Sequence, residues 1–307
     1  KAATCTKPKT CVKCGITDGE KVEHNYANGS CSTCGEKDPA YVVSWKLENG
    51  VLTIYGKGPM EDYNGVVNRA PWYEHRESIK TIIIEGGVTH IGKEAFMSCE
   101  NVQKVEMAST VSSIGQSAFH SCKKLTSITI PESVTVIGRM AFCWCEKLES
   151  INIHKGLTHI EDFVFQFTRV SSIVLPNGLL SIGESAFFMT PLTSVTLPNT
   201  LVSIGESAFA FTDISKLTIP GSVKEISDEA FFSCNLLKET VIESGTTSIG
   251  YQSFYGCGLA SVEIPSSVTA IDKYAFENCN QLKTIFGVSS SYAETFAKEH
   301  GYTFVEK

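Results

Sequence analysis

The chain has 307 residues, of which 42% are hydrophobic and 19% are charged, a composition typical of a folded protein rather than a disordered one. Its formal net charge of −7 disfavours nucleic acid as a partner, because proteins that bind phosphate backbones normally carry a basic face. Apolar runs stay well short of the about 18 residues that would predict a membrane-spanning helix.

Residues 1–38 form a cysteine-rich segment that contains five of the 12 cysteines. Cys11-x-x-Cys14 and Cys31-x-x-Cys34 are separated by sixteen residues, which is the spacing of a zinc ribbon. Four thiolates would bind one structural zinc ion and replace the core that so short a segment lacks. A three-cysteine site completed by His24 is possible, and disulfides are the alternative in an oxidising compartment.

Residues 39–79 are predicted to cap the N-terminal end of the repeats that follow. The run from 41 to 54 contains two strand-like stretches around Asn49-Gly50, a dipeptide typical of a tight hairpin. Trp45 and Trp72 are expected to pack on the first repeat, since buried aromatic rings contribute strongly to cores. Stacking on carbohydrate is the alternative for these two rings.

Residues 80–286 consist of nine units of 22 or 23 residues, a period that indicates a solenoid. The segment from 125 to 145, LTSITIPESVTVIGRMAFCWC, shows the pattern of strand, turn, Ile-Gly and Ala-Phe. Stacked units bury a continuous core that one unit cannot bury alone. The phenylalanines that mark the nine units are Phe96, Phe119, Phe142, Phe165, Phe187, Phe209, Phe231, Phe254 and Phe276.

Within one unit, Ile128 and Ile130 are predicted to point inward from a short strand and Thr129 outward. Pro131 ends the strand because proline has no N–H for a ladder. Phe142 is expected to lie in a helical or 3₁₀ turn. The prediction is therefore a β-rich α/β solenoid with one parallel sheet.

The position three residues after each marker phenylalanine holds only cysteine or threonine. A column of disulfides would not tolerate threonine, so these side chains are interpreted as buried groups that donate to a loop carbonyl. A redox or metal role is the lesser alternative. The column reads Cys99, Cys122, Cys145, Thr168, Thr190, Thr212, Cys234, Cys257 and Cys279.

The pattern L-x-x-I-x-I-P-x-x-V-x-x-I-G-x-x-A-F-x-x-C resembles the bacterial BspA-like leucine-rich repeat family over residues 80–286. The resemblance implies a right-handed solenoid on a secreted or cell-surface protein, with roles in adhesion and in binding host or bacterial partners. Glu161, Ser227 and Asp272 depart from the pattern by replacing its glycine. We expect these residues to bend the coil locally without breaking it.

Residues 287–307 interrupt the repeat and are predicted to cap its C-terminal end, as in the same family. Ser291 and Glu294 have the spacing of a capping box, and the run from 292 to 300 is a plausible helix that Gly301 ends. Residues 302–305 could add a last short strand.

Two residues after the marker phenylalanine, the central units carry large apolar side chains where the outer units carry small ones. If these side chains are exposed to solvent, they would form a partner-binding site. The alternative is that they turn inward to fill the shortened loops of the threonine-type units. We call them the central stripe: Trp144, Phe167, Met189 and Phe211.

Motifs of common hydrolases and nucleotide-binding enzymes are missing from the sequence, including H-E-x-x-H, G-x-S-x-G and the Walker loop. The sequence therefore predicts a non-catalytic recognition or adhesion module. Its partner would be a protein or glycan on a host or neighbouring cell. A structural spacer of a bacterial cell envelope is the alternative function.

Overall fold

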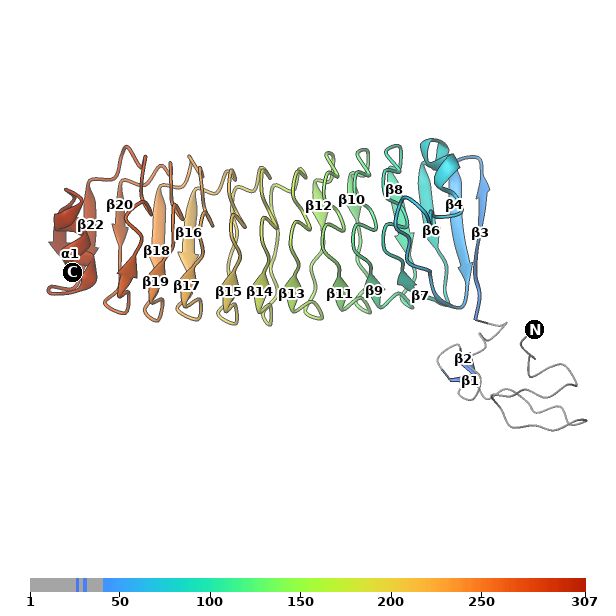
Figure 1. Ribbon diagram of the computed structural model, residues 1–307, viewed down its shortest axis with the longest axis horizontal. Coiled ribbons are helices and arrows are strands. Elements are labelled where there is room, and N and C mark those ends of the chain that lie inside the picture. The colour runs from blue at the N-terminus through green and yellow to red at the C-terminus, as the bar shows by residue number, and fades with distance from the viewer. Residues whose placement is uncertain (1–25, 28–29, 32–40) are drawn as a thin grey trace, which may run out of the picture.

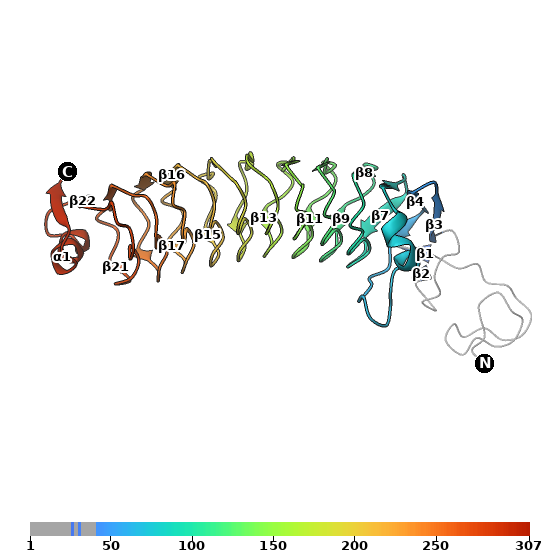
Figure 2. The same ribbon diagram turned by 90° about the horizontal axis from the view of Figure 1, so that it is seen from above.

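The computed structural model describes residues 26–27, 30–31 and 41–307. The repeats form an elongated stack of coils with its two ends far apart (Figure 1). Seen from above, the stack runs in one direction without a sharp bend (Figure 2). The predicted solenoid is confirmed, although its helix content is low: the described residues contain one α-helix and one 3₁₀ helix.

The predicted parallel sheet lies along one side of the stack, and its strands pair in the register of the repeat. It is interrupted in the central coils, where only one pair of strands and a single bridge between Ser172 and Ser194 are present. Its repeat strands are β6 (Thr81–Ile84), β8 (Lys104–Met107), β10 (Ser127–Ile128), β12 (Ser150–Ile151), β16 (Lys216–Ile219), β18 (Glu239–Ile242), β20 (Ser261–Glu263) and β22 (Thr284–Gly287).

A second row of parallel strands, which the sequence analysis did not predict, lies where each unit reads x-Ile-Gly. Most of these strands have two residues, too few for an alternating pattern to be visible in the sequence. They are β7 (Val88–Ile91), β9 (Ser113–Ile114), β11 (Val136–Ile137), β13 (His159–Ile160), β14 (Ser181–Ile182), β15 (Ser203–Ile204), β17 (Glu225–Ile226), β19 (Ser248–Ile249) and β21 (Ala270–Ile271).

The glycine that follows six of these nine strands lets neighbouring coils approach closely. A Cβ on Gly138 would lie 2.7 Å from the backbone nitrogen of Gln116. The row breaks before β13 and before β17, the coils in which Glu161 and Ser227 replace the glycine, whereas the Asp272 coil stays paired. The Ser227 hydroxyl donates instead to the Ile204 carbonyl at 2.5 Å. The departures therefore loosen the ladder locally, and the stack continues through them.

The turn around each marker phenylalanine is not helical, so that prediction was wrong. Its residues form a third ladder in which alternate N–H groups donate to the next coil. Phe163, Phe165 and Phe167 donate to the carbonyls of Glu184, Ala186 and Phe188 at 2.8, 2.9 and 3.1 Å. In the coils before the last, the residues two before and two after the phenylalanine adopt positive φ, as at Phe163 (59°) and Phe167 (58°). Left-handed residues alternating with others direct the N–H groups toward the next coil.

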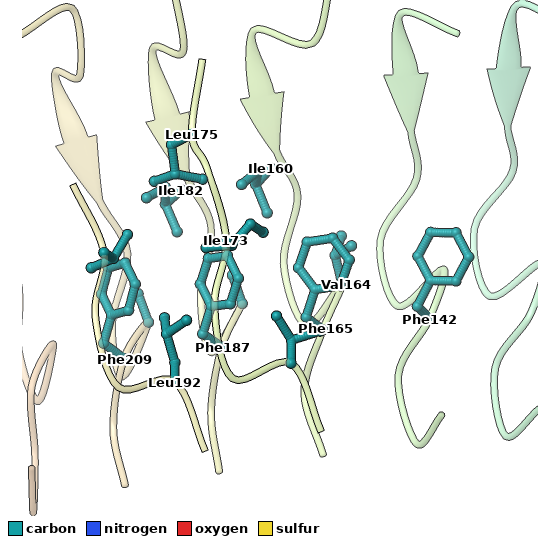
Figure 3. Packing of buried hydrophobic residues seen from close by; sticks show 14 of the residues in the cluster. Phe142, Ile160, Val164, Phe165, Ile173, Leu175, Ile182, Phe187, Leu192 and Phe209 are labelled. Atoms are coloured by element: carbon teal, nitrogen blue, oxygen red, sulfur yellow. The ribbon is translucent and has the colours of Figure 1, made fainter. Parts of the chain in front are cut away.

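The core is a column of the nine marker phenylalanines, each at most 2% exposed. Figure 3 shows Phe142, Phe165, Phe187 and Phe209 following one another along the stack. Neighbouring rings are stacked with centroids 5.2–6.1 Å apart. Because one coil supplies only one ring, the column is stabilised by contacts between coils.

At the N-terminal end, β3 (Val43–Glu48) and β4 (Val51–Gly56) form an antiparallel hairpin whose turn has positive φ at Asn49 and Gly50. β4 pairs with β6, and β5 (Gly58–Pro59) pairs with β7, so the cap adds one coil in front of the repeats. A 3₁₀ helix, η1 (Tyr73–Ser78), leads into the first repeat.

Trp72 occupies the place of a marker phenylalanine in this added coil. Its ring stacks on Phe96 with centroids 5.5 Å apart, and its indole N–H donates to the Ala95 carbonyl at 2.8 Å. The Tyr63 N–H donates to Lys93, so two acceptors of the third ladder are satisfied. Trp72 is buried and the half-buried Trp45 packs against its edge, which favours packing over carbohydrate stacking for both rings.

At the C-terminal end, α1 (Tyr292–Glu299) is followed by β23 (Thr303–Glu306), which pairs with β22 in parallel. The expected capping box is not formed. The Glu294 carboxylate accepts from the N–H of Ser290 at 2.7 Å, and the Ser291 hydroxyl is buried without a partner among the described residues. The side chain of Phe296 covers the end of the core through an edge contact with Phe276.

Candidate partner-binding surface

The cysteine and threonine column is structural. Cys122 and Cys145 donate to the phenylalanine carbonyl of the preceding coil at 3.4 and 3.2 Å. Thr168 donates to the carbonyl of its own marker phenylalanine at 2.8 Å. Burial raises the pKa of Cys99 to about 12 and that of Cys279 to about 11, so these two thiols stay protonated.

The predicted zinc ligands Cys11, Cys14 and Cys34 lie outside the described residues. Only the backbone of Cys31 is described, at the end of a short antiparallel pair, β1 (Tyr26–Ala27) and β2 (Ser30–Cys31). Within the described part of the chain, His, Cys, Asp and Glu do not gather into a group of three that could hold a metal ion. The zinc site therefore remains a prediction.

The central stripe lies on the surface of the turns that form the third ladder. Trp144, Met189 and Phe211 are 41%, 49% and 43% exposed, and Phe167 is half-buried. The alternative expectation, that the shortened loops turn these side chains inward, is wrong. The loops are filled by Thr168, Thr190 and Thr212, whose hydroxyls bond within their own coil.

The stripe is part of a longer run of aromatic rings that the sequence columns did not reveal. The run takes its rings from positions one and two residues after the marker phenylalanine, and each ring contacts the next at centroid distances of 4.1–5.6 Å. Phe188, Phe232 and Tyr255 join it from the first of these positions. We call the run the aromatic row: Trp144, Phe167, Phe188, Phe211, Phe232 and Tyr255.

The stripe residues adopt a backbone conformation that large side chains avoid. The φ angles of Trp144, Phe167, Met189 and Phe211 are 60°, 58°, 55° and 59°. This left-handed region costs an L-residue other than glycine about 1–2 kcal/mol. The other five coils place small residues, Ser98, Ser121, Ser233, Gly256 and Asn278, at the same position with the same sign of φ. The loop itself therefore does not require a large side chain.

A second feature of these turns is a set of carboxylates three residues before the marker phenylalanine. The aromatic row lies on the other side of that phenylalanine in the same turn. The outermost coils have Lys93, Gln116, Arg139, Tyr251 and Lys273 at the equivalent position. We call the carboxylates the acidic row: Asp162, Glu184, Glu206 and Asp228.

The acidic row is accessible. Glu184, Glu206 and Asp228 are exposed. Asp162 lies 3.9 Å from Arg139 at one end of the row, and Asp228 accepts the N–H of Tyr251 at 2.7 Å. Within the described chain, the carboxylates of Glu184 and Glu206 make no hydrogen bond or ion pair.

Two hollows offer further surfaces. One, of about 550 Å³, lies over the interrupted part of the first sheet and is lined by residues 150–153, 172–174 and 194–196. Beside it, the Asn152 side chain accepts from the N–H of Ile130 and donates to its carbonyl, in place of a backbone partner. The other, of about 240 Å³, lies in the N-terminal cap between Trp45, Met60 and Trp72. Neither brings charged groups together.

His90 links Ser113 and Asp62, a combination that the sequence analysis missed because the residues are far apart in the chain. The Ser113 hydroxyl lies 2.7 Å from His90 Nδ1, and Asp62 lies 3.5 Å from Nε2. A hydrogen bond from the backbone N–H of Lys93, followed by the interaction with His90, holds the pKa of Asp62 below its usual value. The N–H groups of Ser112 and Gly115 both donate to the neighbouring coil at 2.8 Å, which leaves neither for an oxyanion.

The described residues include no helix with the length and apolar content needed to cross a bilayer. α1, with eight residues, is the α-helix of this part of the chain.

Comparison with known proteins places these features in a family. Residues 70–187 and 158–283 match the model of the BspA type leucine rich repeat region, with six copies. No curated protein matches.

Solved structures of three bacterial proteins are similar. A leucine rich cell surface protein from Faecalibacterium prausnitzii is 23% identical, with 88% of this chain and 93% of that chain covered and a TM-score of 0.49. Leucine-rich repeat proteins from Eubacterium ventriosum (22% identity, 79% and 82% covered, TM-score 0.42) and Bacteroides ovatus (20%, 86% and 98%, 0.45) are also similar. Because the family match spans more than half of the chain, this protein belongs to the BspA type leucine-rich repeat family.

Proposed function

We propose that the solenoid is an extracellular recognition and adhesion module that binds a protein or glycan partner through the central coils. The observation that carries this proposal is the aromatic row, in which six rings contact one another across the surface of neighbouring coils. Contiguous exposed apolar surface commonly marks an interaction site.

Neither folding nor packing explains the central stripe. Met189 and Phe211 are 49% and 43% exposed, and both adopt left-handed φ. Serine, asparagine or glycine would fit that conformation at lower cost, as they do in the outer coils. Large apolar side chains at these positions are therefore best explained by contact with a partner.

The alternative function is a structural spacer in a bacterial cell envelope. A spacer needs only a soluble surface, and small polar residues at every stripe position would supply one. The exposed side chains of Trp144, Met189 and Phe211 therefore favour recognition over the spacer function. A location on the cell surface or in the secreted fraction is part of the proposal and is supported by what membership of the family implies.

A binding screen against glycans and extracellular matrix proteins tests the proposal. The intact chain is compared with a Trp144→Ala/Phe211→Ala variant, and Ser98→Ala/Ser121→Ala serves as the matched control at the same loop position in outer coils. We expect the first variant to lose at least about tenfold in affinity, the loss typical of an aromatic anchor, and the control to bind normally. Equal binding by all three proteins would overturn the proposal.

We further propose that Cys11, Cys14, Cys31 and Cys34 bind one structural zinc ion. The paired C-x-x-C spacing supports this, because such pairs present four thiolates tetrahedrally. The measurement is metal analysis of the purified chain under reducing conditions, with one zinc per chain expected. A chain without zinc would rule the site out and favour the disulfide alternative.

A further inference from the structure

We propose that the partner segment is a cationic amphipathic α-helix that lies along the stack, with its apolar face on the aromatic row and its lysines or arginines along the acidic row. This inference rests on the proposed function and names the chemistry of the partner at the same surface. Charge, ring geometry and spacing each contribute to it.

Charge indicates a basic partner. The turns of the four coils that carry the acidic row contain six carboxylates and no lysine or arginine. These turns are residues 161–167, 183–189, 205–211 and 227–233. Glu184 and Glu206, whose carboxylates have no partner in the described chain, lie in the middle of this set. Arg139, in the coil of Trp144, and Lys273, one coil beyond Tyr255, lie on either side of this negative surface. Complementary charge would favour encounter with a basic segment and fix its orientation.

The geometry of the rings favours apolar side chains over sugar rings. Trp144 stacks on Phe167 with centroids 4.1 Å apart, and Phe232 stacks on Tyr255 at 4.5 Å with parallel planes. These contacts cover ring faces that a sugar would need. Beside the rings, Met189 adds an aliphatic side chain that is 49% exposed, which suits contact with the apolar side chains of a protein.

Spacing favours a helix over an extended segment. Ladder hydrogen bonds hold neighbouring coils about 4.8 Å apart. The rings of the aromatic row follow one another at 4.1–5.6 Å. A helix advances about 5.4 Å per turn, so one apolar and one basic side chain per turn would meet one ring and one carboxylate per coil. Side chains on one face of a strand recur about every 6.6 Å. An extended segment would therefore fall out of register with the coils within a few repeats.

The length of the row sets the length of the segment. From Trp144 to Tyr255 the row crosses five junctions between coils, and the stack shows no sharp bend there (Figure 2). A straight helix that follows the row would need about 18 residues. An anionic membrane surface is a poorer fit, because its lipids would be repelled by the acidic row.

Three synthetic peptides of about 18 residues test the inference by fluorescence polarisation, the length again following from helix rise. The first has leucines at i, i+3 and i+4 spacing and lysines along the flank. The second has the same composition in an order without helical periodicity, and the third has glutamate in place of lysine. We expect the first peptide to bind at least about tenfold more tightly than either of the others.

Two variants assign the binding to the two rows. Phe211→Ser should weaken binding of the first peptide at least about tenfold. Serine is the residue that occupies the same loop position in several outer coils. Glu184→Gln/Glu206→Gln should weaken it about fivefold and reduce its salt dependence, since exposed ion pairs contribute modestly. Glu225→Gln, on the second strand row, is the matched control and should change nothing. Unchanged thermal midpoints would show that the variants remain folded.

The outcomes separate the two proposals. Equal affinity for the three peptides, binding unaffected by the glutamate variant, or binding only to vesicles of phosphatidylcholine and phosphatidylserine would overturn the helix inference. If the matrix or glycan screen still gives binding that depends on Trp144 and Phe211, the recognition function stands without it. Loss of row-dependent binding in both experiments would overturn both proposals.

Discussion

The same turns carry two runs of aromatic rings, the buried column of marker phenylalanines and the aromatic row at the surface. The two runs differ in the physical reason for their large side chains. The marker phenylalanines are at most 2% exposed and occur in every coil, whereas the stripe residues Trp144, Met189 and Phe211 are 41–49% exposed and occur only in the centre. The buried column recurs because each coil needs it to bind the next. The other five coils stack with small residues at the stripe position, so we attribute the large side chains of the central stripe to a partner outside the molecule.

The largest effect that tests this comparison is expected for Phe187→Ala in the buried column. Removing a ring stacked between two others leaves a cavity in a core that cannot collapse, and we expect a loss of about 3–5 kcal/mol in the free energy of unfolding. Urea denaturation followed by circular dichroism gives the value. A loss below about 1 kcal/mol would mean that contacts in the phenylalanine column do not stabilise the stacking of the coils.

A smaller effect is expected for Cys145→Ala, which removes a buried thiol and its hydrogen bond to the Phe119 carbonyl. The lost volume and the lost thiol hydrogen bond should cost about 1 kcal/mol by the same denaturation, because the Phe119 carbonyl still accepts the N–H of Cys122 at 3.1 Å. Cys143→Ala, a neighbouring buried thiol with a long contact of 3.5 Å to the Gln166 side chain, is the control and should cost less. A larger loss for the control would contradict the structural role of the column.

The smallest effect is expected on the exposed side, for Met189→Asn. Asparagine tolerates left-handed φ, so relief of backbone strain should offset the half-buried contacts that methionine loses. The free energy of unfolding should stay within about 1 kcal/mol of the parent value. Asn278, at the equivalent position of the last repeat, shows that the loop accepts this residue. A loss as large as that of Phe187→Ala would place Met189 in the core and remove a support of the proposed surface.

Most of the fold could be predicted from the sequence because each coil repeats one short pattern. The nine phenylalanines, the inward isoleucines and the strand of the first sheet follow from periodicity alone. The second strand row and the third ladder could not be predicted, since their bonds join residues in different coils and their local pattern is only two or three residues long. The helical interpretation of the Ala-Phe turn failed for this reason: a positive φ at Ser121 or Trp144 has no sequence signal when the residue is not glycine.

The candidate surface shows the same division. The sequence determined that Trp144, Phe167, Met189 and Phe211 share one position in consecutive units, because the repeat alone places equivalent residues next to each other. Whether they face solvent was decided by the tertiary structure, through the threonine hydroxyls that fill the short loops and the left-handed backbone that turns the stripe outward. The row that includes Phe188, Phe232 and Tyr255 also appears only in three dimensions, since its rings come from two different positions of the repeat and meet only when the coils stack.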